Sequence, residues 1–178
     1  MRRFNIILTE LAILLVVAHA FMASIQVLGI STISIYTLPY ALLAVVLVHA
    51  ILSIGLTARA IRSGRASGHW YARQNAGFWT MRISGVAILL FLLFHVFNYM
   101  DIVNGVFYMR EFQLGNLLMQ LAFMAAIIAH VGVGVKSLLI ARGTRHYKER
   151  TDDVLLALSV IALLLIAAVI AYFIQWQL

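Results

Sequence analysis

The sequence predicts an all-α integral membrane protein with a single domain, a bundle of five transmembrane helices. Two observations about composition lead to this fold class: of the 178 residues, 64% are apolar and only 11% are charged. A soluble domain is usually about half apolar and a quarter charged. The chain also has no cysteine, which excludes a disulfide framework, a thiolate zinc site and an iron–sulfur ligand set within it.

Five apolar stretches are long enough to cross a bilayer, whose core of about 30 Å requires about 20 apolar residues per helix. They cover residues 4–28, 36–60, 80–100, 112–140 and 153–174. Pro39 falls in the first turn of the second stretch, where its missing N–H is tolerated. The first stretch is too long for a signal peptide and lacks a clean small-residue cleavage site, so we count it as a span.

The positions of the cations predict the direction of the spans. Twelve of the 13 Lys and Arg residues lie at the N-terminus, in the 61–80 connection, in the connection between the fourth and fifth spans, or at the adjoining span ends. Only Arg110 lies elsewhere. The positive-inside rule therefore places the N-terminus in the cytoplasm and the C-terminus outside. Tyr172 and Trp176 fit an outer aromatic belt. The net charge of +7 is accordingly a topology signal, and we expect no nucleic-acid partner.

Four of the six histidines lie inside spans, one on each of the first four: His19, His49, His95 and His130. Ionisable residues within a membrane are costly and usually mark function. At a rise of 1.5 Å per residue, His95 lies roughly 9 Å and His19 roughly 15 Å from the outer ends of their spans. His130 lies roughly 28 Å from the outer end, and His49 roughly 15 Å from the inner end. Depth thus predicts an outer pair, His19 with His95, and an inner pair, His49 with His130.

Two histidines that face each other at one depth can bind a haem iron from both axial sides, and helical bundles are where such sites are built. We therefore predict two haem b groups. Small residues near the ligands, such as Gly85, let a macrocycle or another helix approach closely. A metal-ion transporter is the alternative for a histidine set, but it usually needs carboxylates inside the spans, and Glu10 is the only one away from the span ends.

The chain resembles a known family in its five spans, its histidines on the first four, and an Arg-x-Ser-Gly start to the third span, formed by Arg82, Ser84 and Gly85 ahead of His95. These features are similar to the single-chain dihaem membrane anchor of succinate dehydrogenase and fumarate reductase, the respiratory complex II. The resemblance covers essentially the whole chain. In that family the ligand pairs come from the first and third, and the second and fourth, spans.

The resemblance implies a larger complex in the cytoplasmic membrane. An iron–sulfur subunit would dock on the cytoplasmic face and carry a flavoprotein with covalent FAD, which would perform the dicarboxylate chemistry. This chain would pass electrons between the iron–sulfur clusters and a quinone, with menaquinone favoured by the two-haem form. The basic, aromatic connection over residues 61–80 would form part of the docking surface, or else set the topology and contact lipid headgroups.

The haem propionates would need cations or hydroxyl donors in a low-dielectric setting. The candidates are Arg82, Ser84, Lys136, Arg142 and His69. For quinone contacts, the outer candidates are Gln26, Tyr36, Asn98 and Asp101, and the inner candidate is Glu10. Glu10 could instead be neutralised by Arg2, Arg3 or a neighbouring helix, or be protonated in place.

The chain departs from the family at two points. Some members carry a glutamate two residues before the fourth-span ligand, where this chain has Ile128, and the short outer loop 29–35 has no carboxylate. The first departure argues against a dedicated transmembrane proton route, and the second means that quinone contacts must come from elsewhere.

Three alternatives to this family remain open. They are the cytochrome b subunit of a hydrogenase or formate dehydrogenase, a stand-alone transmembrane cytochrome b reductase, and a haem-free transporter or scaffold.

Overall fold

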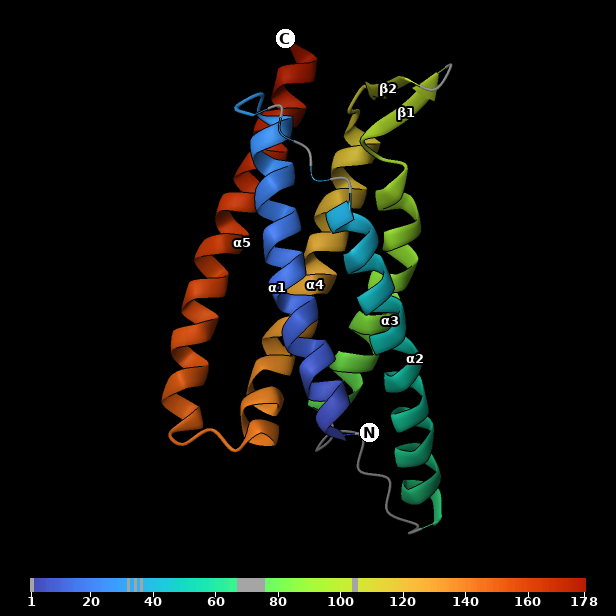
Figure 1. The fold of residues 1–178 in the computed structure, drawn as a ribbon, viewed down its shortest axis with the longest axis vertical. Helices are drawn as coiled ribbons and strands as arrows, with labels where there is room; N and C mark the ends of the chain where they lie inside the picture. Colours follow the sequence, from blue (N-terminus) through green and yellow to red (C-terminus); the bar gives the residue numbers. More distant parts are fainter. Residues whose placement is uncertain (1, 32, 34, 36, 67–75, 104–105) are drawn as a thin grey trace.

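The computed structural model describes residues 2–31, 33, 35, 37–66, 76–103 and 106–178. Within them the chain forms five long helices (Figure 1). These are α1 (Arg2–Val27), α2 (Thr37–Ala66), α3 (Ala76–Val96), α4 (Leu114–Arg142) and α5 (Tyr147–Gln177). Each is long and apolar enough to cross a membrane. The chain is therefore a multi-pass membrane protein, as the sequence predicted.

The helices alternate in direction, so the two termini lie at opposite ends of the bundle (Figure 1). We call the end that holds the N-terminus and the α4–α5 connection the lower end, and the end that holds the C-terminus the upper end. Gly143 closes α4 at the lower end in the left-handed conformation, with φ 77°, and its N–H bonds back to the Ile140 carbonyl. A residue with a Cβ would be strained there.

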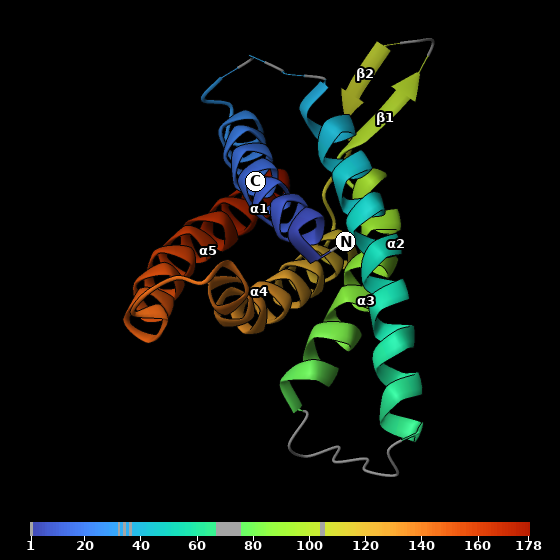
Figure 2. The ribbon, with the colours of Figure 1, turned by 60° about the horizontal axis from the view of Figure 1, so that its bottom comes forward.

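The helices do not pack evenly around the bundle. α3 packs closely on α4, α4 on α5, and α1 on α2, while α1 also contacts α4 and α5. The backbone of α2 makes at most sparse approaches to α3 and α4, and no residue of α2 is buried. Figure 2 shows α2 beside α1 and α3, far from α5. Side chains rather than close backbone packing therefore connect α2 to α3 and α4.

One cluster of buried apolar side chains lies at the upper end. Phe112 is fully buried, and Leu117 and Tyr172 pack with it. The Tyr99 ring stacks on Phe112 at 5.2 Å. By contrast, large apolar side chains such as Leu164 are mostly exposed along the helices. In lipid this outer surface is solvated by hydrocarbon, while the helices satisfy their own backbone hydrogen bonds.

The bundle itself is all-helical, as predicted, but the connection between α3 and α4 contains two short strands. An antiparallel hairpin of β1 (Met100–Val103) and β2 (Val106–Met109) joins α3 to α4, with Met100 opposite Met109 and Val103 opposite Val106. In the sequence Asn104-Gly105 separates the strands, and this is the dipeptide that short hairpins favour.

The helix ends also differ from the predicted spans. α2 continues to Ala66 and α5 already begins at Tyr147, so both include polar residues that a hydropathy criterion assigns to loops. α3 is shifted, because it begins at Ala76 and ends at Val96, before the hairpin. Helices extend beyond the hydrocarbon core, so composition alone does not mark where they end.

Candidate functional site

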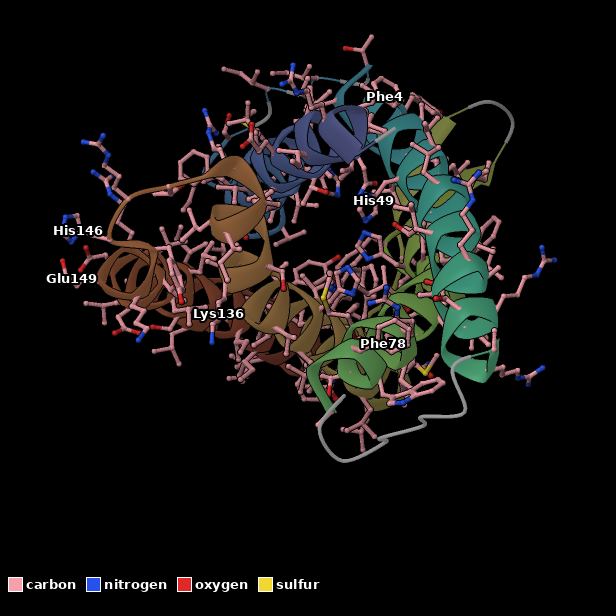
Figure 3. All side chains as sticks on the ribbon, turned by 90° about the horizontal axis from the view of Figure 1, so that it is seen from below. Phe4, His49, Phe78, Lys136, His146 and Glu149 are labelled. Carbon is pink, nitrogen blue, oxygen red and sulfur yellow. The ribbon has the colours of Figure 1, made fainter. Side chains whose placement is uncertain are left out.

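The four intramembrane histidines meet in two pairs across the bundle. The rings of His19 on α1 and His95 on α3 have their centroids 6.1 Å apart and are nearly perpendicular. The rings of His49 on α2 and His130 on α4 are 6.5 Å apart, with the same arrangement. Figure 3, seen from below, shows His49 directed into the space that the helices surround. These are the pairs that the depth argument predicted.

The outer pair is positioned chiefly through His95, the penultimate residue of α3. Its Nδ1 lies 2.9 Å from Oε1 of Gln120, which is buried on α4. Because the amide oxygen can only accept, Nδ1 is the donor in this bond, and in a neutral imidazole Nε2 then keeps its lone pair. Phe123 and Tyr99 flank the ring at 5.0 and 5.7 Å. Gln120 thus orients the His95 ring and leaves its Nε2 available to bind a metal.

The inner pair is positioned mainly through His130. Its Nδ1 donates to the Met81 carbonyl at 3.0 Å, and the hydroxyl of Ser84 lies 3.2 Å from the same nitrogen. Gly85 makes room for the ring, since a Cβ at this position would lie 3.3 Å from Cε1 of His130. Met81, Ser84 and Gly85, at the Arg-x-Ser-Gly stretch, therefore position the His130 ring. Again Nε2 is left with its lone pair.

The partner histidines on α1 and α2 are held less tightly. Nδ1 of His49 lies 3.5 Å from the hydroxyl of Thr9, and its Nε2 lies 3.4 Å from the hydroxyl of Ser53. Both distances are at the limit of a hydrogen bond. Within the described part of the chain, the His19 ring has no hydrogen-bond partner. It contacts the ring of His95 edge to face. Each pair thus joins one firmly oriented imidazole to one that can adjust.

The two pairs are well separated along the length of the bundle. His95 bonds to Gln120, so Gln120 marks the level of the outer pair on α4. His130 lies ten residues further along the same helix, which is roughly 15 Å at the rise of an α-helix. The two pairs are therefore independent sites at different depths.

The spacing within each pair fits an iron bound from both sides. A metal–imidazole bond is about 2 Å, and the ring centroid lies about 1.2 Å behind the nitrogen, so a bis-histidine metal sets the centroids roughly 6 Å apart. Among the described residues, no group of three or more His, Cys, Asp or Glu side chains comes together. A bare zinc ion needs about four ligands, whereas a haem iron needs only two axial ones. The donor sets therefore fit haem better than a free cation.

A partly buried cation adjoins the inner pair. The Nε of Arg82 donates to the hydroxyl of Thr57 on α2 at 3.2 Å, and its guanidinium lies 3.8 Å above the Phe78 ring. Its neighbours Met81 and Ser84 are the residues that hold His130. Within the described part of the chain no carboxylate pairs with Arg82. Arg82 can therefore receive an anionic group beside the inner pair.

The other residues predicted for propionate contact lie in different settings. The buried Ser84 hydroxyl donates to the Thr80 carbonyl and faces His130, which makes it a positioning residue for the ligand. Lys136 is exposed on the α4–α5 side of the bundle, away from His49 (Figure 3). Arg142 forms an ion pair with Glu10. His69 lies outside the described residues.

The residues predicted for quinone contact do not form one cluster. Asn98 is buried near the upper end and pairs with Asn116 of α4. The Gln26 amide donates to the Ile33 carbonyl at the end of α1. The Glu10 carboxylate is taken up by Arg142. Tyr36 lies outside the described residues, and for Asp101 only the backbone, in β1, is described.

Sequence reasoning missed three groups that hold the histidines: the Gln120 amide, the Met81 carbonyl and the Thr9 hydroxyl. Gln120 and Thr9 could have been noticed, because they are polar side chains inside apolar spans. The Met81 carbonyl could not, because every residue has a backbone carbonyl and the sequence does not show which one will face the histidine.

No protein-family model, no curated protein and no solved structure matches this chain.

Proposed function

We propose that this chain is the membrane-anchoring dihaem cytochrome b subunit of a succinate:quinone oxidoreductase, a succinate dehydrogenase or fumarate reductase. The observation that carries this proposal is the pair of facing histidine sites, from α1 with α3 and from α2 with α4, each with the centroid spacing of a bis-histidine metal and each with only two protein ligands. The family that the sequence resembles uses the same pairing of helices.

In this proposal His19 and His95 bind the outer haem, and His49 and His130 bind the inner haem. A bound haem b would supply a one-electron carrier, and two haems at different depths would form an electron path through the membrane. The chain's own contribution is orientation. Gln120 fixes His95, and the Met81 carbonyl with Ser84 fixes His130. Such supporting hydrogen bonds set the ring angle and raise the basicity of a metal-binding imidazole.

The lower end faces the cytoplasm in this proposal, because the cations gather there. Arg62 and Arg65 lie on the α2 extension, and Arg145 and Lys148 lie around the α4–α5 connection. An iron–sulfur subunit, itself joined to a flavoprotein with FAD, would dock on this face of the cytoplasmic membrane. Arg82 would bind a propionate of the inner haem, the haem nearer to that subunit, and quinone, as menaquinone, would react near the outer haem.

Co-purification tests the proposal against its closest rivals. We would solubilise membranes in mild detergent, purify the chain by an affinity tag, and record which polypeptides accompany it. The proposal expects a large flavin-fluorescent subunit and a smaller iron–sulfur subunit, together with succinate-dependent reduction of the haems. Haem without these partners would support a stand-alone reductase, and different partners would support a hydrogenase or formate dehydrogenase subunit. A chain without haem would contradict all three.

A further inference from the structure

The five helices divide into two packed units. α1 packs closely on α2, and α3 and α5 both pack closely on α4. Each histidine pair takes one ring from each unit, because His19 and His49 belong to α1 and α2, and His95 and His130 belong to α3 and α4. Both candidate haem sites therefore lie at the boundary between the α1–α2 unit and the α3–α4–α5 unit.

One side of this boundary, where α1 meets α4 and α5, is packed. Leu8 of α1 is buried, and Val27 packs against the buried cluster that includes Tyr172 of α5. Towards the lower end, Glu10 forms an ion pair with Arg142 of α4. The α1 side is thus held towards both ends of the bundle.

The other side of the boundary, where α2 faces α3, is loosely packed. No residue of α2 is buried, and its backbone makes at most sparse approaches to α3 and α4. Figure 2 shows α2 next to α3 and far from α5. A polar contact crosses here, because the Nε of Arg82 donates to the Thr57 hydroxyl at 3.2 Å. We call this side the α2–α3 seam.

The α2–α3 seam can open in a membrane at little cost. Lipid tails are as apolar as the helix surfaces that would separate, and each helix keeps its own backbone hydrogen bonds. Arg82 would lose the Thr57 hydroxyl, but its guanidinium also lies 3.8 Å above the Phe78 ring and donates to the Phe78 carbonyl at 3.4 Å. Opening on the α1 side would instead break buried packing and an ion pair.

The hydrogen bonds that support the histidines do not cross the boundary. The described side-chain bonds of His95 and His130 run between α3 and α4. Those of His49 go to Thr9 of α1 and to Ser53 of α2 itself. Separation of the two units would therefore leave each of these rings supported within its own unit.

We propose that haem enters the apo chain sideways from the membrane through the α2–α3 seam, with α2 as the moving helix and α1 as the hinge. This inference rests on the proposed function, in which both histidine pairs bind haem b. A flat and mostly apolar haem can lie in the bilayer, and Arg82 at the seam can attract its propionates. Closure then returns the histidines of the α1–α2 unit to positions opposite their partners, and no electron is transferred.

Two other routes compete with the seam. Haem could enter from the aqueous lower end, or the chain could capture haem while it is still folding. The seam is favoured because the described packing of the bundle is weakest there. The experiment below separates the three routes.

Haem uptake by a cross-linked apo chain tests the proposal. The chain has no cysteine, so introduced cysteines can be joined selectively by a short bismaleimide in membranes from haem-deficient cells. Thr57→Cys/Arg82→Cys joins α2 to α3 at their hydrogen bond. Glu10→Cys/Arg142→Cys is the matched control, because it joins α1 to α4 at their ion pair. We expect the first cross-link to abolish uptake of added haemin and the second to leave uptake unchanged.

The order of addition distinguishes a closed entry route from a damaged site. Thr57→Cys/Arg82→Cys that is loaded with haem first and cross-linked afterwards should retain both haems in the pyridine haemochrome assay. Without the cross-linker it should still take up haemin. Thr57→Cys/Phe78→Cys is a second seam variant that keeps Arg82, which contacts both replaced side chains, and it should behave in the same way.

Three results would overturn the inference. Unchanged uptake in the cross-linked seam variants would favour the aqueous end, and a block by the Glu10–Arg142 cross-link alone would move the entry to the α1 side. A wild-type apo chain that takes up no added haemin would favour capture during folding. The wild-type chain from haem-replete cells is a separate readout: two haems there, with any of these results, would reject the entry route alone, whereas absence of haem would reject the proposed function.

Discussion

The two histidine pairs are built alike but held differently. In the outer pair, His95 depends on one side chain, the Gln120 amide, in an aromatic setting with Phe123 and Tyr99. In the inner pair, His130 depends on the backbone carbonyl of Met81, with Ser84 as a second contact. A substitution can remove an amide side chain but not a carbonyl of the main chain. The outer site should therefore be sensitive to the loss of a polar group, and the inner site to added bulk.

The pairs also differ in charge. Arg82 lies in the same turn of α3 as Met81 and Ser84, which contact His130. The described contacts of His95 are with neutral groups. A nearby cation stabilises the reduced state of a haem, which carries one more negative charge than the oxidised state. We therefore expect the inner haem to have the higher midpoint potential.

The largest effect should come from removing a ligand. His95→Ala or His19→Ala should remove only the outer haem, and His49→Ala or His130→Ala only the inner one, because the pairs are separate sites. The pyridine haemochrome assay should fall from two haems per chain to one in each variant. His146→Ala, at an exposed position before α5, is the control and should keep both. A pattern that pairs the histidines otherwise would contradict the assignment.

Gln120→Leu should loosen the outer haem and spare the inner one. Loss of a supporting hydrogen bond typically lowers the affinity of a metal site about 10- to 100-fold. Haem transfer to apomyoglobin measures the retention of each haem. Ser84→Ala is the comparison, with a smaller effect on the inner haem because the Met81 carbonyl still accepts from His130. Equal effects of the two variants would remove the distinction between the pairs.

Gly85→Val should perturb the inner haem and spare the outer one. Even one Cβ at this position would lie 3.3 Å from the His130 ring, and overpacking of this kind typically costs about 1–3 kcal/mol. We expect roughly tenfold weaker retention of the inner haem, with an altered low-temperature α-band. Gly55→Val, where a Cβ meets nothing within 4 Å, should leave both haems unchanged.

Arg82→Gln should lower the midpoint potential of the inner haem by an amount on the order of tens of millivolts, because it removes a nearby positive charge. Redox titration of the reduced bands measures this shift. Lys136→Gln removes one cation from the exposed side of α4 and should shift neither potential. A larger shift of the outer haem in Arg82→Gln would reverse the proposed electrostatic difference.

The smallest effect concerns the ion pair between Glu10 and Arg142, which lies outside both histidine pairs. Its side chains are 33% and 63% exposed, and such pairs usually contribute about 0.2–1 kcal/mol. Glu10→Gln should lower the thermal midpoint in detergent by about 1–3 °C. It should leave the reduction of the haems by added menaquinol unchanged. A loss of that reduction would restore Glu10 as a quinone contact.

Periodic and compositional features of the sequence were enough to predict the helices and the pairing of the histidines. Span length, one histidine per span and the rise of a helix placed His19 with His95 and His49 with His130, because straight antiparallel helices convert residue number into depth. Hydropathy could not place helix ends such as Ala66 and Tyr147, which lie among polar residues.

The supporting contacts depend on how the helices are rotated, which the sequence does not specify. Gln120 is a polar residue in an apolar span, yet only the packing of α3 on α4 brings it to His95. The same packing turns Ser84 toward His130, whereas the sequence suggested a propionate contact. Glu10 finds Arg142 far along the chain, although the sequence offered Arg2 and Arg3 as nearer cations. Rotation about the helix axis thus decided the roles that depth alone left open.

The most direct test of the account is the haem content of the purified chain. A dithionite-reduced minus oxidised spectrum, combined with pyridine haemochrome quantitation, counts b haems per chain without any assumption about partners. The two pairs predict two haems, with bands that separate in a redox titration. A chain that carries no haem when it is produced with ample haem supply would contradict the account, and the four histidines would then need another explanation.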